Sequence, residues 1–323
     1  MKINGSKILI TGGAGFVGSH TVDYLLHKDP KQIIVFDNFS RGIGENLKKA
    51  EKSGRLKIVN GDIRNIDQVN DLLKGVDYVF HQAAIRITRC AEEPRLCQEV
   101  LIDGTFNILE SCVKNNVKKL IFSSSASVYG DPSYLPMDEK HPFNNTTAYG
   151  AAKIASEEMI KAFRAMYGLN YVILRYFNVY GPRMDIYGVY TEVLIKWLEK
   201  IDNHEAPIIH GDGKQSLDFV YVEDVAQANV KALESEINQG IYNVGTGKST
   251  SLKELLDILL EETKSDLKPV YEPVVKRPYV QKRCADTSLA KKEIKFSAKL
   301  NLNEGLRKLI VWRKKQLQEK AKI

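Results

Sequence analysis

A glycine-rich turn between a short apolar run and an amphipathic stretch constrains this chain more than any other feature. Residues 7–20 read KILITGGAGFVGSH. Ile8 to Ile10 form a run that is too short for a helix and suits a buried parallel strand. Four glycines follow, and SHTVDYLLHK after them has the pattern of a helix. A strand, a tight turn and a helix in this order predict the start of a doubly wound α/β fold.

The spacing of these glycines also predicts a ligand. Gly12, Gly15 and Gly18 satisfy G-x-x-G-x-x-G, and Gly13 completes G-x-G-x-x-G with the last two. Glycines at this spacing permit the tight turn and let backbone N–H groups approach a pyrophosphate. The N-terminus of the next helix carries a partial positive charge that attracts the same group. The segment therefore indicates a bound dinucleotide.

Asp37 favours one dinucleotide over the other. It ends the run QIIVF (32–36), nineteen residues beyond Gly18, where a carboxylate accepts hydrogen bonds from the adenosine ribose. Because a carboxylate repels a 2′-phosphate, NAD is expected rather than NADP, although Arg41 is near enough to keep NADP open. An acidic residue in an ordinary loop is the alternative interpretation of Asp37. Two further strands, in 55–65 and 76–84, fit a parallel sheet with helices between its strands.

Composition limits which classes of protein the chain can belong to. The chain has 323 residues, 43% of them hydrophobic, and a formal net charge of +7. Much of the positive charge lies in 312–322, a stretch typical of a solvated helix face, so nucleic-acid binding is not expected. No run approaches the roughly eighteen apolar residues of a membrane span, and the N-terminus lacks the features of a signal peptide. We expect a cytoplasmic protein that binds neither membrane nor nucleic acid.

The cysteines and histidines suggest no metal site. The four cysteines show no C-x-x-C spacing, which favours free thiols in a reducing compartment, and the six histidines show no ligand spacing. The cysteines are Cys90, Cys97, Cys112 and Cys284.

Tyr149 and Lys153, in TTAYGAAK (146–153), are four residues apart and so share one face of a helix. A helix start without function is the simpler interpretation. The strand LIFSSSASVYG (120–130) would bring Ser123, Ser124 or Ser125 into the same cleft, since ligands bind beyond the carboxyl ends of such strands. Those serines could equally cap the segment that follows. A cation about 4 Å from a phenol lowers its pKa by roughly three units at an effective dielectric near 20.

Nine segments in order resemble the extended short-chain dehydrogenase/reductases, in particular the NAD-dependent nucleotide-sugar epimerase/dehydratase group and, within it, the UDP-glucose 4-epimerases. The resemblance covers residue 7 to about 310. The segments are TGGAGFVGSH, VFDNFSRG, NGDIRN, FHQAA, SSSASVYG, YGAAK, LRYFNVYGPR, GDGKQSLDFVYVEDVA and YNVGTGKSTSL.

The resemblance implies a role for each matching residue. Tyr149 is the expected catalytic base and acid, Lys153 lowers its pKa and holds the nicotinamide ribose, and Ser125 bonds the sugar O4. The residues implied to bind NAD are Gly12, Gly15, Phe16, Val17, Gly18, Asp37, Asn38, Asp62, Ile63, Ala83, Ala84, Ser123, Tyr149 and Lys153. The residues implied to bind the nucleotide sugar are Arg86, Ser125, Asn178, Arg277 and Arg283.

The resemblance leaves the reaction to be decided. Members of the group oxidise C4 of the sugar, and a 4-epimerase then returns the hydride to the other face. A 4,6-dehydratase carries an adjacent Asp and Glu in its serine motif, where this chain has Ala126 and Ser127, so dehydration is disfavoured. We expect 4-epimerisation of a UDP-hexose. Decarboxylation of a UDP-uronic acid, another nucleotide-sugar conversion and a non-catalytic NAD-binding protein remain open.

The sugar side departs from the family pattern. Leu217 stands where an arginine usually clamps the diphosphate, and Arg277 matches another diphosphate-binding position. Asn178 could instead be a structural residue of a turn. Arg283 falls where 4-epimerases place the side chain that limits bulk on the sugar, and could contact an acidic sugar or be an exposed loop residue. GTGKST (245–250) is not a P-loop, because Tyr242 occupies the position of its first glycine.

The expected architecture is a Rossmann-like doubly wound sheet with a smaller mixed α/β substrate domain. The NAD-binding domain is expected over 1–178 plus about 208–245, and the substrate domain over 179–207 and 246–312. Residues 313–323 are expected to form a basic C-terminal helix or tail. The resemblance implies a homodimer that meets through helices near 100–116 and 149–167.

Overall fold

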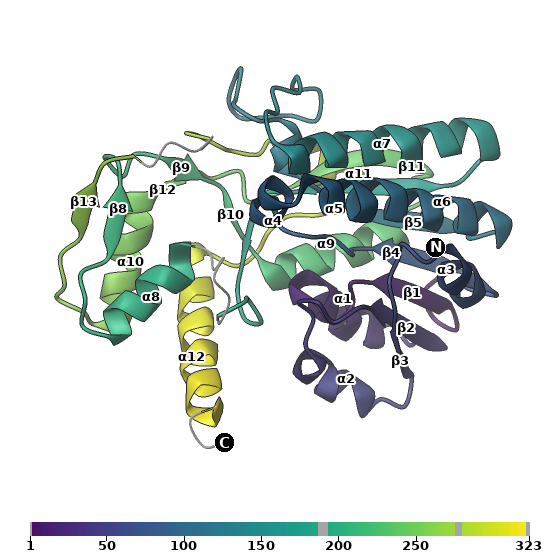
Figure 1. Cartoon of the computed structure of the whole chain (residues 1–323), viewed down its shortest axis with the longest axis horizontal. Helices are drawn as coiled ribbons and strands as arrows, with labels where there is room; N and C mark the ends of the chain where they lie inside the picture. The colour runs from purple at the N-terminus through teal and green to yellow at the C-terminus, as the bar shows by residue number, and fades with distance from the viewer. Residues whose placement is uncertain (1, 187–192, 275–279, 321–323) are drawn as a thin grey trace.

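Seven parallel strands form the central sheet of the protein (Figure 1). The computed structural model describes residues 2–186, 193–274 and 280–320. The strands run in the order β11-β6-β5-β4-β1-β2-β3, and every neighbouring pair is parallel. Their bounds are β1 Lys7–Thr11, β2 Gln32–Asp37, β3 Leu56–Asn60, β4 Tyr78–His81, β5 Lys119–Ser125, β6 Tyr171–Tyr176 and β11 Gln239–Val244. The predicted doubly wound parallel sheet is confirmed.

Helices cover both faces of this sheet and bury two apolar clusters against it. Val22 of α1 and Val225 of α9 pack into one cluster, and Val69 of α3, Ile108 of α6 and Ile160 of α7 pack into the other. The chain crosses from one side of β1 to the other between β3 and β4, which makes β1–β4 the switch point where ligands bind in such sheets. The helix bounds are α1 Phe16–Leu26, α2 Lys48–Glu51, α3 Ile66–Leu73, α4 Ile87–Glu92, α5 Pro94–Gln98, α6 Gly104–Lys114, α7 Ala148–Tyr167, α9 Val222–Glu234 and α11 Ser288–Glu293.

A second lobe lies beyond one end of the sheet (Figure 1). Its core joins Trp197 of α8, Leu256 of α10 and Leu309 of α12. Arg313 of α12 is only 5% exposed and pairs with Asp202, so the expectation of a solvated face over 312–322 is wrong at this position. The elements are α8 Val193–Asp202, α10 Leu252–Thr263, α12 Leu302–Lys320, β7 Asn178–Tyr180, β8 Ile208–His210, β9 Ser216–Leu217, β10 Phe219–Tyr221, β12 Thr250–Ser251 and β13 Val270–Glu272. Within the described ranges, none of the helices combines the length and apolar character that crossing a membrane requires.

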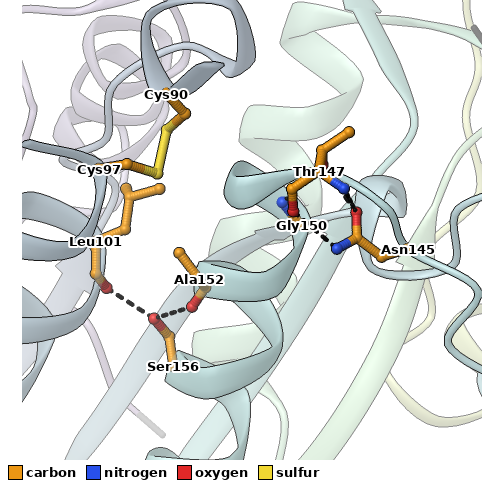
Figure 2. Close-up of a disulfide and its surroundings, with 8 residues drawn as sticks. All are labelled: Cys90, Cys97, Leu101, Asn145, Thr147, Gly150, Ala152 and Ser156. Carbon is orange, nitrogen blue, oxygen red and sulfur yellow. Dashed lines mark hydrogen bonds between the residues drawn. A yellow bond between two sulfur atoms is a disulfide. The ribbon is translucent and has the colours of Figure 1, made fainter. Parts of the chain in front are cut away.

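The start of α7 is fixed by side chains that precede it. Thr147 is the N-cap, and its hydroxyl oxygen accepts a hydrogen bond from the Gly150 N–H at 3.1 Å. Asn145 accepts from the Thr147 N–H at 3.0 Å and donates to the Thr147 carbonyl at 2.8 Å (Figure 2). Further along the helix, Ser156 donates to the Leu101 carbonyl at 2.7 Å. These bonds set where the first turn of α7, with Tyr149 in it, lies relative to the sheet.

A buried ion pair holds the same helix to two strands. Glu157 of α7 and Arg175 of β6 are both almost fully buried and lie 2.6 Å apart, from Oε2 to Nη2. Ser124 of β5 donates to the other carboxylate oxygen of Glu157 at 2.5 Å, and the second terminal nitrogen of Arg175 donates to the Tyr129 hydroxyl at 3.0 Å. Glu157 is two turns beyond Tyr149 and one beyond Lys153, so all three residues share one face of α7.

The expectation of four free thiols is wrong for two of them. Cys90 of α4 and Cys97 of α5 form a disulfide, with their Cα atoms 4.8 Å apart, beside the inner face of α7 (Figure 2). The two short helices fold back on each other, and this juxtaposition, which spacing does not reveal, brings the sulfurs together. Cys112 is buried and free, and Cys284 is partly buried and free. The cytoplasmic location stays a prediction.

Replacing Glu157 should destabilise the protein strongly. In Glu157→Gln the buried Arg175 guanidinium loses its counter-charge, and we expect the free energy of unfolding to fall by about 3–5 kcal/mol. Glu158→Gln is the matched control, because Glu158 is the next residue, is exposed and pairs with the exposed Lys161; it should cost less than about 1 kcal/mol. Urea unfolding curves measure both, and equal midpoints would contradict the role given to the buried pair.

Candidate functional site

A cavity of about 850 Å³ opens at the carboxyl ends of the central strands and reaches the second lobe. Its volume is within the range of small-molecule sites, roughly 300–1,000 Å³. The predicted residues in its wall are Gly12, Gly15, Phe16, Val17, Gly18, Asp37, Asn38, Asp62, Ile63, Ala83, Ala84, Arg86, Ser125, Tyr149, Asn178 and Arg283. Ser123 and Lys153 are buried behind this wall, and Arg277 lies outside the described residues.

The glycine turn is shaped for a ligand that approaches the backbone. Gly12 has φ +69°, and a Cβ there would come within 2.8 Å of the Ala83 backbone. A Cβ on Gly18 would collide with the Gly12 carbonyl oxygen. Gly15 is the N-cap of α1, so the N–H groups of Phe16, Val17 and Gly18 have no acceptor within the helix and face the cavity wall. Such a cradle fits a pyrophosphate.

Asp37 and Asp62 lie at the same end of the cavity. The Asp37 carboxylate accepts hydrogen bonds from the Ala14 N–H at 3.0 Å and the Phe39 N–H at 2.9 Å, and burial raises its pKa. A carboxylate offers about four acceptor positions, so further donors such as ribose hydroxyls can be bound. Asp62 is held by Arg64, whose hydrogen bonds lower the pKa of Asp62 to about 2, and it accepts from Asn38 at 3.1 Å. The acidic wall fits the ribose and not a 2′-phosphate.

His81 is a buried residue that supports the cavity wall between the glycine turn and the acidic end, and it takes no part in proton transfer. Thr11 Oγ1 lies 2.7 Å from His81 Nδ1, and His81 Nε2 lies 3.0 Å from Thr105 Oγ1. Burial lowers the pKa of His81 to about 3, so the ring is neutral at pH 7. The same Thr11 hydroxyl oxygen accepts from the Ala83 N–H at 3.2 Å. This network fixes the backbone that the glycine turn contacts.

Tyr149 and Ser125 meet in the wall at the other end. Tyr149 is in the first turn of α7 and lines the cavity together with Ser125. Ser125 ends β5 and accepts from the Ser127 N–H at 3.1 Å. Burial raises the pKa of Tyr149, while the Ser125 hydrogen bond and the charges of Arg283 and Arg41 act in the opposite direction.

Lys153 supports the site from beneath. Its ammonium donates to the Ser123 carbonyl oxygen at 2.7 Å, lies 4.7 Å from the centre of the Phe122 ring and 5.9 Å from that of Tyr149. Burial lowers the pKa of Lys153 to about 8. Burial is the largest influence on the pKa of Tyr149, and the Lys153 ammonium bonds a backbone carbonyl, so the expected lowering of the Tyr149 pKa by Lys153 stays a prediction.

The predicted sugar-binding residues that the structure describes come from separate segments of the chain. Asn178 begins β7, and its buried Oδ1 has no hydrogen-bond partner among the described residues. Arg86 is the N-cap of α4 and lies 3.5 Å from Asp185. Leu217 packs against the core of the second lobe, so its position offers no cationic group to the cavity. Arg283 is in the wall beside Tyr149.

Sequence reasoning missed two cations that line the cavity. Arg183 ends the motif LRYFNVYGPR; one of its terminal nitrogens bonds Asp23 at 2.6 Å, and the other is buried with no partner in the described ranges. The motif itself was the available signal for Arg183. Lys196 of α8 also lines the cavity, and nothing local in the sequence marks it.

The turn that imitates a P-loop is filled by a side chain of the protein. Asp218 accepts from the Thr246 N–H at 2.8 Å and from the Gly247 N–H at 2.9 Å, and also from the Ala285 N–H at 3.1 Å. Because these donors already hold a carboxylate, the turn fastens three segments together. This agrees with the prediction that GTGKST is not a phosphate-binding loop.

Comparison with known proteins places the chain among nucleotide-sugar enzymes. The sequence model described as the NAD dependent epimerase/dehydratase family matches residues 8–245. A Methanocaldococcus jannaschii protein named "Putative UDP-glucose 4-epimerase" is 41% identical over 314 residues, which covers 95% of this chain and 98% of that protein. A Bacillus cytotoxicus UDP-N-acetyl-alpha-D-glucosaminuronate decarboxylase is 31% identical, with 95% and 97% covered.

A solved structure shows the same likeness in three dimensions. The UDP-N-acetylglucosamine 4-epimerase of Methanobrevibacter ruminantium M1, in complex with UDP-N-acetylmuramic acid, superimposes with a TM-score of 0.92. It is 37% identical, and the match covers 97% of this chain and 99% of that one. The likeness therefore extends over both the sheet and the second lobe.

Gly18→Ala should prevent the chain from retaining NAD. The new Cβ would meet backbone atoms of Gly12 and Gly13, which cannot move without opening the turn. We expect NAD released from the denatured purified protein to fall by about tenfold or more per chain, equivalent to a loss of about 1.4 kcal/mol in binding. Gly44→Ala is the control, since a Cβ there meets nothing within 4 Å. Unchanged NAD content in Gly18→Ala would exclude this turn as the pyrophosphate cradle.

Proposed function

Since this chain belongs to the NAD dependent epimerase/dehydratase family, we propose that it is a nucleotide-sugar 4-epimerase that inverts C4 of a UDP-linked hexose. NAD is its cofactor. The observation that carries the proposal is that Tyr149 and Ser125 lie in the wall of the cavity that also contains the glycine cradle. A proton acceptor and a dinucleotide site share one chamber.

The residues divide the work as follows. When bound in the glycine cradle, NAD would supply an acceptor for the hydride of the sugar C4. Tyr149 accepts the proton of the 4-hydroxyl and gives it back, while Ser125 holds O4 by a hydrogen bond. Lys153, fixed to the Ser123 carbonyl, places a positive charge 5.9 Å from the centre of the Tyr149 ring. The 4-keto sugar rotates in the site before the hydride returns to the other face of C4. Because the same hydride is returned, the reaction has no net redox change.

The residues after Ser125 support epimerisation over dehydration. Elimination of water across C5 and C6 needs an acid–base pair, and the two positions of the serine motif that would supply it are Ala126 and Ser127. Ser127 lines the cavity, but its hydroxyl is not ionised at neutral pH and serves as a partner of Ser125 at 3.2 Å. Decarboxylation, the activity in the name of the Bacillus cytotoxicus relative, is the second candidate, because it starts from the same 4-keto sugar.

Tyr149→Phe tests the mechanism directly. Removing the general base should lower kcat by about 10²–10⁴-fold, with NAD content unchanged, because the phenol contributes to proton transfer and not to the cradle. The assay is conversion of UDP-glucose, UDP-N-acetylglucosamine and UDP-glucuronate without added NAD, with products separated by chromatography. Tyr271→Phe, at an exposed site on β13 outside the cavity wall, is the control and should retain full activity. A Tyr149→Phe enzyme with wild-type turnover would refute the assignment.

We also propose that the protein is a homodimer built on α6 and α7, which pack side by side on one face (Figure 1). Phe106 of α6 is 44% exposed, and Met166 and Tyr167 of α7 are 60% and 57% exposed. Light scattering should give twice the mass of one chain. Phe106→Glu should give the monomer mass, and Val311→Glu, at an exposed site on α12, should leave the dimer intact. A monomeric wild-type protein would exclude the interface.

A further inference from the structure

We propose that Arg283 makes this site selective for nucleotide sugars whose hexose carries a carboxylate at C6, that is, UDP-linked hexuronic acids. The inference rests on the proposed 4-epimerase and names the substrate class of that same site. It is supported by the position of Arg283, which lines the same cavity wall as Tyr149 and Ser125, the two residues proposed to act at the sugar C4.

The backbone on both sides of Arg283 is held in place. The Arg283 N–H donates to the Ser216 carbonyl oxygen at 2.9 Å. On the opposite edge, Met137 donates to the Cys284 carbonyl at 2.8 Å, and Asp286 donates to the Met137 carbonyl at 2.8 Å. Because successive side chains of an extended segment point to opposite sides, Lys282 is exposed while Arg283 turns into the cavity. The guanidinium is thus presented from a fixed frame.

The Arg283 side chain has hydrogen-bonding capacity that the described residues do not use. Its Nε is buried and has no partner among them. The charged and titratable groups that act on it are Asp131, which is exposed, and Tyr149. Burial lowers the pKa of Arg283 to about 10, so it remains a cation at pH 7. A buried donor left without an acceptor is costly, which favours an anionic ligand.

The covalent structure of a hexuronic acid matches this placement. Its carboxylate is attached to C5, the carbon next to C4, so the group that reads the carboxylate must lie close to those that read O4. Arg283, Tyr149 and Ser125 all line the cavity, and Arg283 is close enough to Tyr149 for the two side chains to interact electrostatically. A guanidinium can bind both oxygens of a carboxylate, whereas the hydroxymethyl group of a neutral hexose has no charge to offer it.

Another role for Arg283 would be to assist Tyr149 alone. The two side chains interact electrostatically, and removing the cation would then raise the pKa of the phenol with any substrate bound. Such a role predicts an equal loss of activity on neutral and acidic sugars. Recognition of a carboxylate predicts a loss confined to the acidic sugar. UDP-glucose and UDP-glucuronate differ only at C6 and therefore separate the two roles.

The experiment compares wild-type protein, Arg283→Gln and the matched control Lys282→Gln, which removes one charge from the neighbouring exposed position. We expect wild-type kcat/KM to be higher for UDP-glucuronate than for UDP-glucose. Arg283→Gln should lower the value for UDP-glucuronate by about tenfold or more, mainly through KM, and that for UDP-glucose by less than about threefold. Arg283→Lys should restore part of the loss, since an ammonium keeps the charge without the planar fork.

Three results would overturn the inference: an equal loss on both substrates, a wild-type preference for UDP-glucose, or the same effect in Lys282→Gln. Melting temperature and NAD content verify that each variant is folded. Calorimetric binding of both UDP sugars to the NAD-loaded protein supplies a readout that needs no turnover. If no UDP sugar is converted, the proposed epimerase fails, while tighter binding of UDP-glucuronate that Arg283→Gln abolishes would still support carboxylate recognition.

Discussion

The buried pair of Glu157 and Arg175 is the constraint on which the rest of the site depends. Tyr149 and Lys153 both lie on α7. The Glu157–Arg175 pair fastens this helix to β5 and β6 two turns beyond the tyrosine. Charges removed from water favour one geometry because any displacement leaves them uncompensated. The cap formed by Asn145 and Thr147 fixes the beginning of the helix in the same way. Chemistry at the cavity wall thus relies on polar contacts outside it.

The two ends of the cavity are built on different principles. Main-chain N–H groups and glycines make the cofactor end, so almost any sequence that keeps the turn keeps the cradle. Side chains from distant segments make the sugar end: Ser125 from β5, Asn178 from β7 and Arg283 from the segment just before α11. A common core with a variable sugar end accounts for relatives that share the fold while their names give different reactions.

Local patterns explain what the sequence could reveal. The turn around Gly12, the acidic residue at the end of β2 and the four-residue step from Tyr149 to Lys153 depend on short stretches of chain, and the structure has each as expected. Contacts between distant segments could not be read in this way. The direction of the Lys153 ammonium, the burial of Arg313 and the pairing of Cys90 with Cys97 all depend on how elements pack. Arg283 is an intermediate case. The sequence indicated its position at the sugar end, but not that its buried Nε has no hydrogen-bond partner among the described residues.

Trp312 and Gln316 of α12 line the same cavity as Gly12, so one chamber is enclosed by the first and the last helices of the chain. During synthesis the cradle around Gly12 emerges about three hundred residues before Trp312 and Gln316, which complete its far wall. Closure of the chamber is thus a late, long-range event in folding, of the kind that slows it. A nascent chain can meet its cofactor with one side still open, and a chain that stops before α12 would lack part of the cavity wall.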